Sequence, residues 1–207
     1  GDGFGSEARE DLLARMFDGD LAVMVDDDVE PPLGADDPAL NALIEQAERL
    51  VGQADDPKLM LASNHVTELV KDGFNVVVFC RFIATAHYIG RHFADHLRGT
   101  TVAVVTGQMQ SEERQERVSR LAESEHGRIL VATDCLSEGI NLQDNFDAVV
   151  HYDLSWNPTR HEQREGRVDR FGQTSKTVRV TLLYGSNNPV DGAVLQVILR
   201  KAARIRE

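Results

Sequence analysis

The sequence predicts an α/β fold around a mainly parallel β-sheet, and two observations lead to this prediction. The apolar runs after residue 57 are continuous and rich in Val, Ile and Leu, which indicates strands that are buried on both faces. Helical patterns separate these runs, and strand–helix–strand alternation is typical of a parallel sheet with right-handed crossovers. We expect strands at 76–80, 101–106, 129–133, 148–153 and 178–184. We expect helices at about 58–72, 83–97, 111–124, 136–140, 158–169 and 190–205.

The acidic side chains are concentrated in the first quarter of the chain. Residues 1–57 hold 16 acidic and 3 basic side chains, a net charge of −13, so the whole-chain charge of −12 leaves +1 for residues 58–207. An acidic chain is a poor free-standing nucleic-acid binder, but its balanced remainder could approach a phosphate backbone. We interpret the Asp26–Asp28 run as a solvated loop rather than a metal cluster. The predicted parts are an acidic helical or linker segment, 1–56, and a domain, 57–207.

Composition excludes several classes of protein. Hydrophobic residues make up 42% of the chain and charged residues 27%, which is ordinary for a soluble globular protein. No apolar run approaches the roughly 18–20 residues that span a bilayer, so we expect no membrane partner. Cys80 and Cys135 each lie in an apolar run, which favours reduced, buried thiols and a cytoplasmic location. The start, Gly1-Asp2-Gly3, has neither an initiator Met nor a secretory pattern, so we expect the chain to be cut from something longer.

The residues that follow the predicted strands are polar, cationic or glycine. In parallel sheets the chemistry gathers at the carboxyl ends of the strands, so these residues are candidates for a site. They are Arg81, Thr106, Gly107, Thr133, Asp134, the loop Ser137–Asn141, Asp153, Trp156 and Asn157. Taken alone, Thr106-Gly107 is equally well explained as a turn.

The most informative segment runs from Asn157 to Gln173. Asn157 is a good N-cap and Pro158 a good first helical residue. Helical spacing puts four later residues on one face, namely Gln163, Gly166, Arg167 and Arg170. A glycine inside a helix costs about 1 kcal/mol relative to alanine, which indicates the close approach of a bulky group. Two arginines one turn apart suit a polyanion such as a triphosphate, although surface ion pairs are the structural alternative. Arg164 lies off this face, and we expect it to matter less.

These segments resemble the motifs of superfamily-two helicases. Gln163-x-x-Gly166-Arg167-x-x-Arg170 is similar to motif VI, Ile129–Asp134 with Ser137–Leu142 to motif V, Val76–Phe82 to motif IV, and Thr106-Gly107 with Glu113-Arg114 to the segment after motif IV. The stretch Tyr152–Pro158 leading to Asp169–Gln173 resembles the Swi/Snf-type translocases on double-stranded DNA and their bacterial relatives. The resemblance covers about residues 57–205.

The resemblance implies a three-layer RecA-like lobe, the second of two such lobes. Its partners would be the N-terminal RecA-like lobe of the same protein and double-stranded DNA. The first lobe's phosphate loop, G-x-x-x-x-G-K-[ST], and its magnesium-binding carboxylate motif do not occur in this sequence. ATP and Mg²⁺ would therefore be bound mainly by that first lobe, and we expect the isolated chain not to hydrolyse ATP.

The resemblance also implies roles for individual residues. Arg167 and Arg170 would act as arginine fingers that stabilise charge on the γ-phosphoryl group, and Gln163 would align them. The positions expected near the nucleotide are Gly139, Asn141 and Gly166. The positions expected to hold DNA phosphates, without reading sequence, are Arg81, Thr106, Gly107 and Thr133.

Two other functions remain open at this stage. One is a non-catalytic nucleotide-binding α/β domain, which would need a phosphate loop of its own. The other is a module that only docks on another protein, with the acidic segment as its tail. His87, His92 and His96 suggest a zinc site, but no further ligand completes it, so we predict no metal.

Overall fold

The structure is a computed structural model of the chain. It describes residues 38–50, 56–136, 140–155 and 158–185, together with five positions of helical geometry: Asp191, Gly192, Leu195, Gln196 and Leu199. Several sequence-based expectations fall outside these residues, including those for Asp26–Asp28, Gly139, Trp156 and Asn157. The predicted helices at 136–140 and 190–205 are covered only in part.

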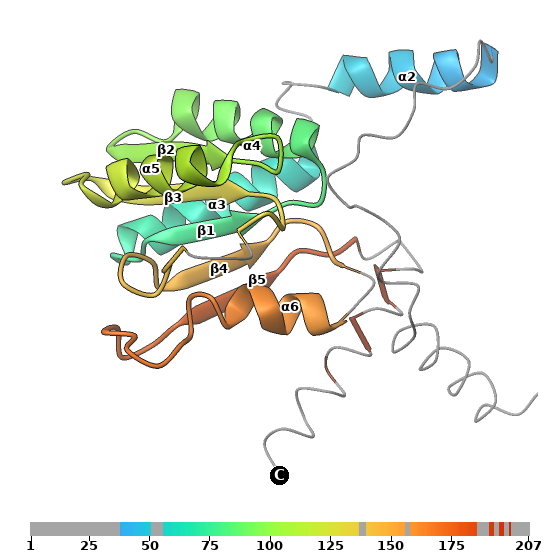
Figure 1. Cartoon of the computed structure of the whole chain (residues 1–207). Helices are drawn as coiled ribbons and strands as arrows, with labels where there is room; N and C mark the ends of the chain where they lie inside the picture. The colour runs from blue at the N-terminus through green and yellow to red at the C-terminus, as the bar shows by residue number, and fades with distance from the viewer. Residues whose placement is uncertain are drawn as a thin grey trace, which may run out of the picture.

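The core of the fold is a five-stranded sheet in which every neighbouring pair of strands is parallel. The strand order is β2-β3-β1-β4-β5, so the first strand is central (Figure 1). The strands are β1 (Val76–Phe79), β2 (Thr100–Val105), β3 (Gly127–Ala132), β4 (Ala148–His151) and β5 (Arg179–Leu182). β1 and β4 are buried along their whole length, as the continuous apolar runs predict. The predicted α/β class and parallel sheet are confirmed.

Helices cover both faces of the sheet in three layers. The described helices are α2 (Pro38–Leu50), α3 (Pro57–Lys71), α4 (Ile83–His96), α5 (Ser111–Ala122) and α6 (Pro158–Glu165). Of these helices, α2 is drawn away from the sheet (Figure 1). Residues of α3 and α4 form one apolar cluster with the sheet, and residues of α5 form a second one with other strand residues. Figure 1 shows α3 and α5 on opposite sides of the sheet. α3 begins where the sequence predicts, because the Asp56 carboxylate accepts a 2.9 Å hydrogen bond from the Leu59 N–H.

The strand register brings the carboxyl ends of the strands to one edge. Phe79 of β1 lies opposite both Ala132 of β3 and His151 of β4. Backbone hydrogen bonds continue past the strands, from Thr133 N–H to the Val105 carbonyl at 3.2 Å and from Tyr152 N–H to Phe79 at 2.9 Å. The polar residues that follow the strands are therefore gathered at the same edge, as expected for a parallel sheet.

The helix α6 is shorter than predicted. It ends at Glu165, and the next residues form tight turns in which the Arg167 N–H donates to Arg164 and the Val168 N–H to Glu165. Gly166 is therefore not inside a helix but directly after one, where an added Cβ would lie 3.1 Å from the Glu162 carbonyl oxygen. The cost of a glycine inside a helix, from which we expected the approach of a bulky group, therefore does not apply at Gly166.

No helix among the described residues has the length and apolar character that a membrane span requires.

Candidate functional site

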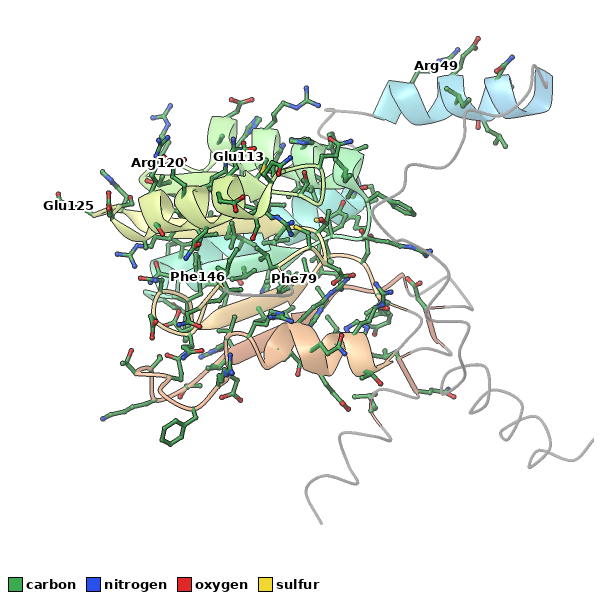
Figure 2. All side chains as sticks on the ribbon, in the orientation of Figure 1. Arg49, Phe79, Glu113, Arg120, Glu125 and Phe146 are labelled. Atoms are coloured by element: carbon green, nitrogen blue, oxygen red, sulfur yellow. The ribbon has the colours of Figure 1, made fainter. Side chains whose placement is uncertain are left out.

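A small pocket lies at the carboxyl edge of the sheet, between the end of β1, the turn after β3 and α6. Its volume is about 120 Å³. It is lined by Phe79, Asp134, Leu136, Arg160, Gln163, Arg164 and Arg167. Phe79 marks the place in Figure 2, where side chains from these elements converge. Three guanidinium groups and one carboxylate give the lining a formal charge of +2, which suits an anionic ligand.

The base of the pocket is an ion pair between Asp134 and Arg164. The Arg164 Nε donates to one carboxylate oxygen at 2.6 Å and Nη2 donates to the other at 2.7 Å. Arg160, one turn earlier on α6, adds a 3.3 Å contact to the same carboxylate. This bidentate geometry fixes both partners and is among the stronger polar contacts in proteins.

The environment of Asp134 keeps its carboxylate charged. Burial alone would raise the pKa of Asp134, but the hydrogen bonds and positive charge of Arg164, aided by Arg160, outweigh burial and lower that pKa below its ordinary value. Arg164 is 3% exposed, and its guanidinium lies 5.4 Å from the centre of the Phe79 ring. A buried Arg held in this way is a structural anchor.

The placement of Arg164 adds a structural role that helical spacing did not predict. From helical spacing, we placed Arg164 off the face of Gln163 and Arg167 and expected its side chain to matter less. The structure instead buries Arg164 against the sheet, so its removal would disturb α6 itself. The expectation that Arg164 contributes less to ATP turnover than Arg167 and Arg170 stays a prediction.

A second polar cluster lies beside this ion pair and consists of two buried histidines and a glutamate. The His151 Nε2 is 3.2 Å from a Glu165 carboxylate oxygen, and the two Nδ1 atoms of His151 and His161 are 3.3 Å apart. His161 Nε2 is 3.1 Å from the Ser155 amide nitrogen. Both rings are essentially unexposed. Burial lowers the pKa of both below the ordinary value, that of His161 to about 4, so both rings are neutral near pH 7.

The structure brings together only some of the residues predicted for the nucleotide. Gln163 and Arg167 both line the pocket. Arg170, Gly166 and Asn141 are exposed and are not among its lining residues. Gln173 anchors the turn after Arg170, because its amide donates to the carbonyls of Val168 and Phe146 at 2.8 and 3.0 Å.

The residues predicted to hold DNA phosphates share the same edge of the sheet but differ in exposure. Arg81 and Gly107 are partly exposed, whereas Thr106 and Thr133 are 1% and 0% exposed. The Thr133 hydroxyl has no hydrogen-bond partner within the described part of the chain. Asp153 organises this region, since its carboxylate accepts from the Arg81 N–H at 3.2 Å and pairs with Lys58 at 2.7 Å.

Sequence reasoning missed the residues that hold the pocket together. Arg160, Arg164 and the histidine pair received no role, and Asp134 was assigned to motif V without a partner on α6. One signal was present: Arg160 and Arg164 are spaced i, i+4, and a carboxylate follows the neighbouring strand. For the metal sites, the described residues contain no group of three or more His, Cys, Asp or Glu side chains placed to hold an ion.

Comparison with known proteins gives a consistent family signal. A model described as "Helicase conserved C-terminal domain" matches residues 59–172. YqhH of Bacillus subtilis (strain 168), an uncharacterized ATP-dependent helicase, is 52% identical over 46 residues, which are 22% of this chain and 8% of that protein. YwqA of the same organism, a proposed ATP-dependent helicase/translocase, is 27% identical over 138 residues, 67% of this chain and 14% of YwqA.

A relative named as an RNA helicase and two solved structures complete the comparison. The pre-mRNA-splicing ATP-dependent RNA helicase PRP28 of Candida glabrata is 26% identical over 147 residues, 71% of this chain and 23% of that protein. The C-terminal part of the Fun30 ATPase domain superposes with a TM-score of 0.63 at 20% identity, covering 77% of this chain and 51% of that one. The C-terminal domain of the DEAD-box protein Dbp5 gives 0.52 at 23% identity, covering 67% and 77%. The chain thus spans under a quarter of the length of the curated relatives it matches.

Proposed function

The chain belongs to the helicase conserved C-terminal domain family, the second RecA-like lobe of superfamily-two helicases, and we propose that it serves a Swi/Snf-type ATPase driven by double-stranded DNA. In this proposal a first lobe of the same protein binds most of the ATP and its Mg²⁺. This chain completes the ATP site from the opposite side. On its own, the chain does not turn over ATP.

The observation that carries the proposal is the cationic pocket at the edge of the sheet. Three guanidinium groups face a single carboxylate there, and Asp134 is already neutralised by Arg160 and Arg164. Arg167 lines the same pocket, and the resemblance to motif VI makes it the proposed contact for an anionic group. A guanidinium placed at a γ-phosphoryl group stabilises the charge that is redistributed in the transition state. Gln163, from the last turn of α6, lies beside it in the same lining.

Double-stranded DNA is the proposed track, and the strand-end residues are its proposed contacts. Arg81 and the Gly107 backbone are partly exposed at the edge, which supports phosphate contact without base reading. Thr106 and Thr133 are buried, so they contribute only if loops at the edge rearrange on binding. RNA is the second candidate, because the matching PRP28 is named as an RNA helicase.

The test uses the protein that joins this chain to its proposed first lobe. We expect Arg167→Ala to cut nucleic-acid-stimulated ATPase by about a hundredfold or more and to change KM for ATP only a few-fold, because a transition-state contact is lost. Arg167→Lys should rescue little, since an ammonium lacks the planar fork. Stimulation by duplex DNA above that by RNA would support the DNA assignment.

A matched control is available on α5. Arg120 is also a surface arginine, with a side chain 75% exposed, and it pairs with Glu116 one turn earlier on α5. Arg120→Ala should leave ATPase unchanged. Near-normal ATPase in Arg167→Ala would overturn the proposed role, and stronger stimulation by RNA would overturn the choice of track.

A further inference from the structure

The helix α6 has an unusual way of attaching to the sheet. Its sequence, Pro158–Glu165, contains no large apolar side chain, and its buried side chains among the described residues are His161 and Arg164. Most amphipathic helices are held by an apolar stripe that faces the core. The position of α6 is therefore set by directional polar contacts, and those of Arg164 account for only part of them.

The remaining contacts form a hydrogen-bond chain whose direction can be deduced. A carboxylate only accepts, so the His151 Nε2 that faces Glu165 must carry the proton and donate. A neutral His151 then has a lone pair on Nδ1, so it accepts from the Nδ1–H of His161. That leaves the His161 Nε2 as an acceptor for the Ser155 N–H.

The opposite direction fails on chemical grounds. If His161 donated from Nε2 to the Ser155 carbonyl, 3.2 Å away, its Nδ1 would have to accept from His151. A neutral His151 would then turn a lone pair toward the Glu165 carboxylate, and two acceptors repel. A doubly protonated His151 would remove that conflict only by placing a cation in the core beside Arg164, which burial disfavours. The hydrogen bonds therefore all donate in one direction, from Ser155 through His161 and His151 to Glu165, and both rings are neutral.

The charged groups around the two rings are consistent with this state. Arg164 on α6 opposes a positive charge on either ring, whereas Glu165 on α6 and Asp134 after β3 favour one. From the sheet side, Phe79 of β1 stacks on His151 with ring centres 6.2 Å apart and offers no charge. Burial is the largest influence, and it lowers the pKa of both histidines.

We infer that the chain from Ser155 through His161 and His151 to Glu165 sets the position of α6, and that the two histidines are positioning residues for Gln163 and Arg167. The hydrogen bond between Ser155 and His161 ties α6 to the loop before it, and the hydrogen bonds of His151 tie α6 to β4. His161 and Glu165 lie on either side of Gln163 in the sequence, and Arg167 follows two residues after Glu165. A loss of these bonds moves the two pocket residues without removing them. This inference rests on the proposed ATPase function.

Two variants of His161 separate positioning from a general loss of stability. An Asn amide nitrogen lies near the place of the ring Nδ1, so His161→Asn keeps the donor to His151. A Gln amide lies near the place of Nε2, so His161→Gln keeps the contact with Ser155 and loses the hydrogen bond to His151 of β4, which leaves only Glu165 in contact with that ring. Both replace the ring by a primary amide, so their cost from lost ring packing is similar.

The experiment measures nucleic-acid-stimulated ATPase in the protein carrying both lobes. We expect His161→Gln to lower kcat by about tenfold with KM for ATP within about twofold, because a small misplacement of groups at the reacting centre lowers the rate. The kcat of His161→Asn should stay within about threefold of the parent value. Nitrogen NMR of the same protein should find His161 protonated at Nδ1 and His151 at Nε2. Equal kcat values for the two variants, or the reverse pair of tautomers, would overturn the inference.

The Arg167→Ala variant separates this inference from the proposed function. If Arg167→Ala abolishes ATPase but His161→Gln leaves it intact, the positioning chain is wrong and the proposed function stands. If Arg167→Ala leaves ATPase intact, the proposed function fails. The NMR tautomers then still decide whether the hydrogen-bond chain exists.

Discussion

The helices α5 and α6 are both rich in Arg and Glu, yet they use these residues in opposite ways. On α5, Arg117 and Arg120 each pair with a glutamate four residues earlier, and all four side chains are at least 42% exposed. Figure 2 shows Glu113 and Arg120 on the outside of the molecule. On α6, the Arg164 side chain is 4% exposed and is locked to a carboxylate from another element.

The difference lies in what attaches each helix to the sheet. α5 buries Val118 and Leu121 in the apolar cluster on its face of the sheet, so its charges are free to stay in water. α6 has no such residues and depends on Arg164 and His161. Apolar contacts tolerate small shifts, whereas hydrogen bonds require a fixed geometry. If Gln163 and the following Arg167 act as proposed, polar contacts suit α6 because they fix its position more closely.

The largest test of this comparison removes the α6 anchor. We expect Arg164→Ala to destabilise the chain by about 3–5 kcal/mol, because the variant leaves the Asp134 carboxylate partly buried without its bidentate partner. Urea unfolding of the 207-residue chain measures this effect. The double variant Asp134→Asn/Arg164→Met should lose less than Arg164→Ala alone, since it removes both charges and keeps the volume. A cost below about 1 kcal/mol for Arg164→Ala would mean that the ion pair does not anchor α6.

An intermediate effect is expected from acidification, through His161. Its pKa is about 4 in the folded chain against an ordinary 6.5, so the unfolded chain binds the proton more tightly between these values. Stability therefore falls as the pH decreases from about 6.5 to 4, by at most about 3 kcal/mol from this group. Measured over that range, the His161→Asn variant should lose less stability than the parent. Parallel pH profiles for the two proteins would contradict the buried, neutral state of His161.

The sheet was predictable from sequence because its signal is local and strong. Val76–Phe79 and Ala148–His151 are buried along their whole length, and each predicted strand lies within two residues of the observed one at either end. The parallel class also places Arg81, Thr106 and Thr133 at one edge of the sheet. A continuous apolar run is best buried as a strand that is covered on both faces of the sheet.

The details of α6 were not predictable, because its attachments are distant in sequence. Asp134 precedes Arg164 by 30 residues, and no local pattern links His151 to Glu165. The end of the helix at Glu165 depends on turns that Gln173 ties to the Phe146 carbonyl. From the sequence, we assumed that the helix continues through Gly166, and we therefore placed Arg170 on the same face as Gln163. In the structure Arg170 does not line the pocket.

The smallest effect is predicted for the ion pairs of α5. Arg120 and Glu116 are 2.6 Å apart, closer than most partners in this chain, but their side chains are 75% and 62% exposed. Water screens such a pair, and holding two long side chains costs entropy, so its net contribution is small despite the short distance. We expect Arg120→Ala to change the urea unfolding free energy by less than about 0.5 kcal/mol, the range for surface substitutions. Leu121→Ala, the next residue and a buried one, should cost about 2–5 kcal/mol in the same measurement. Similar losses in both variants would mean that the charges of α5 also hold their helix, and the contrast with α6 would no longer stand.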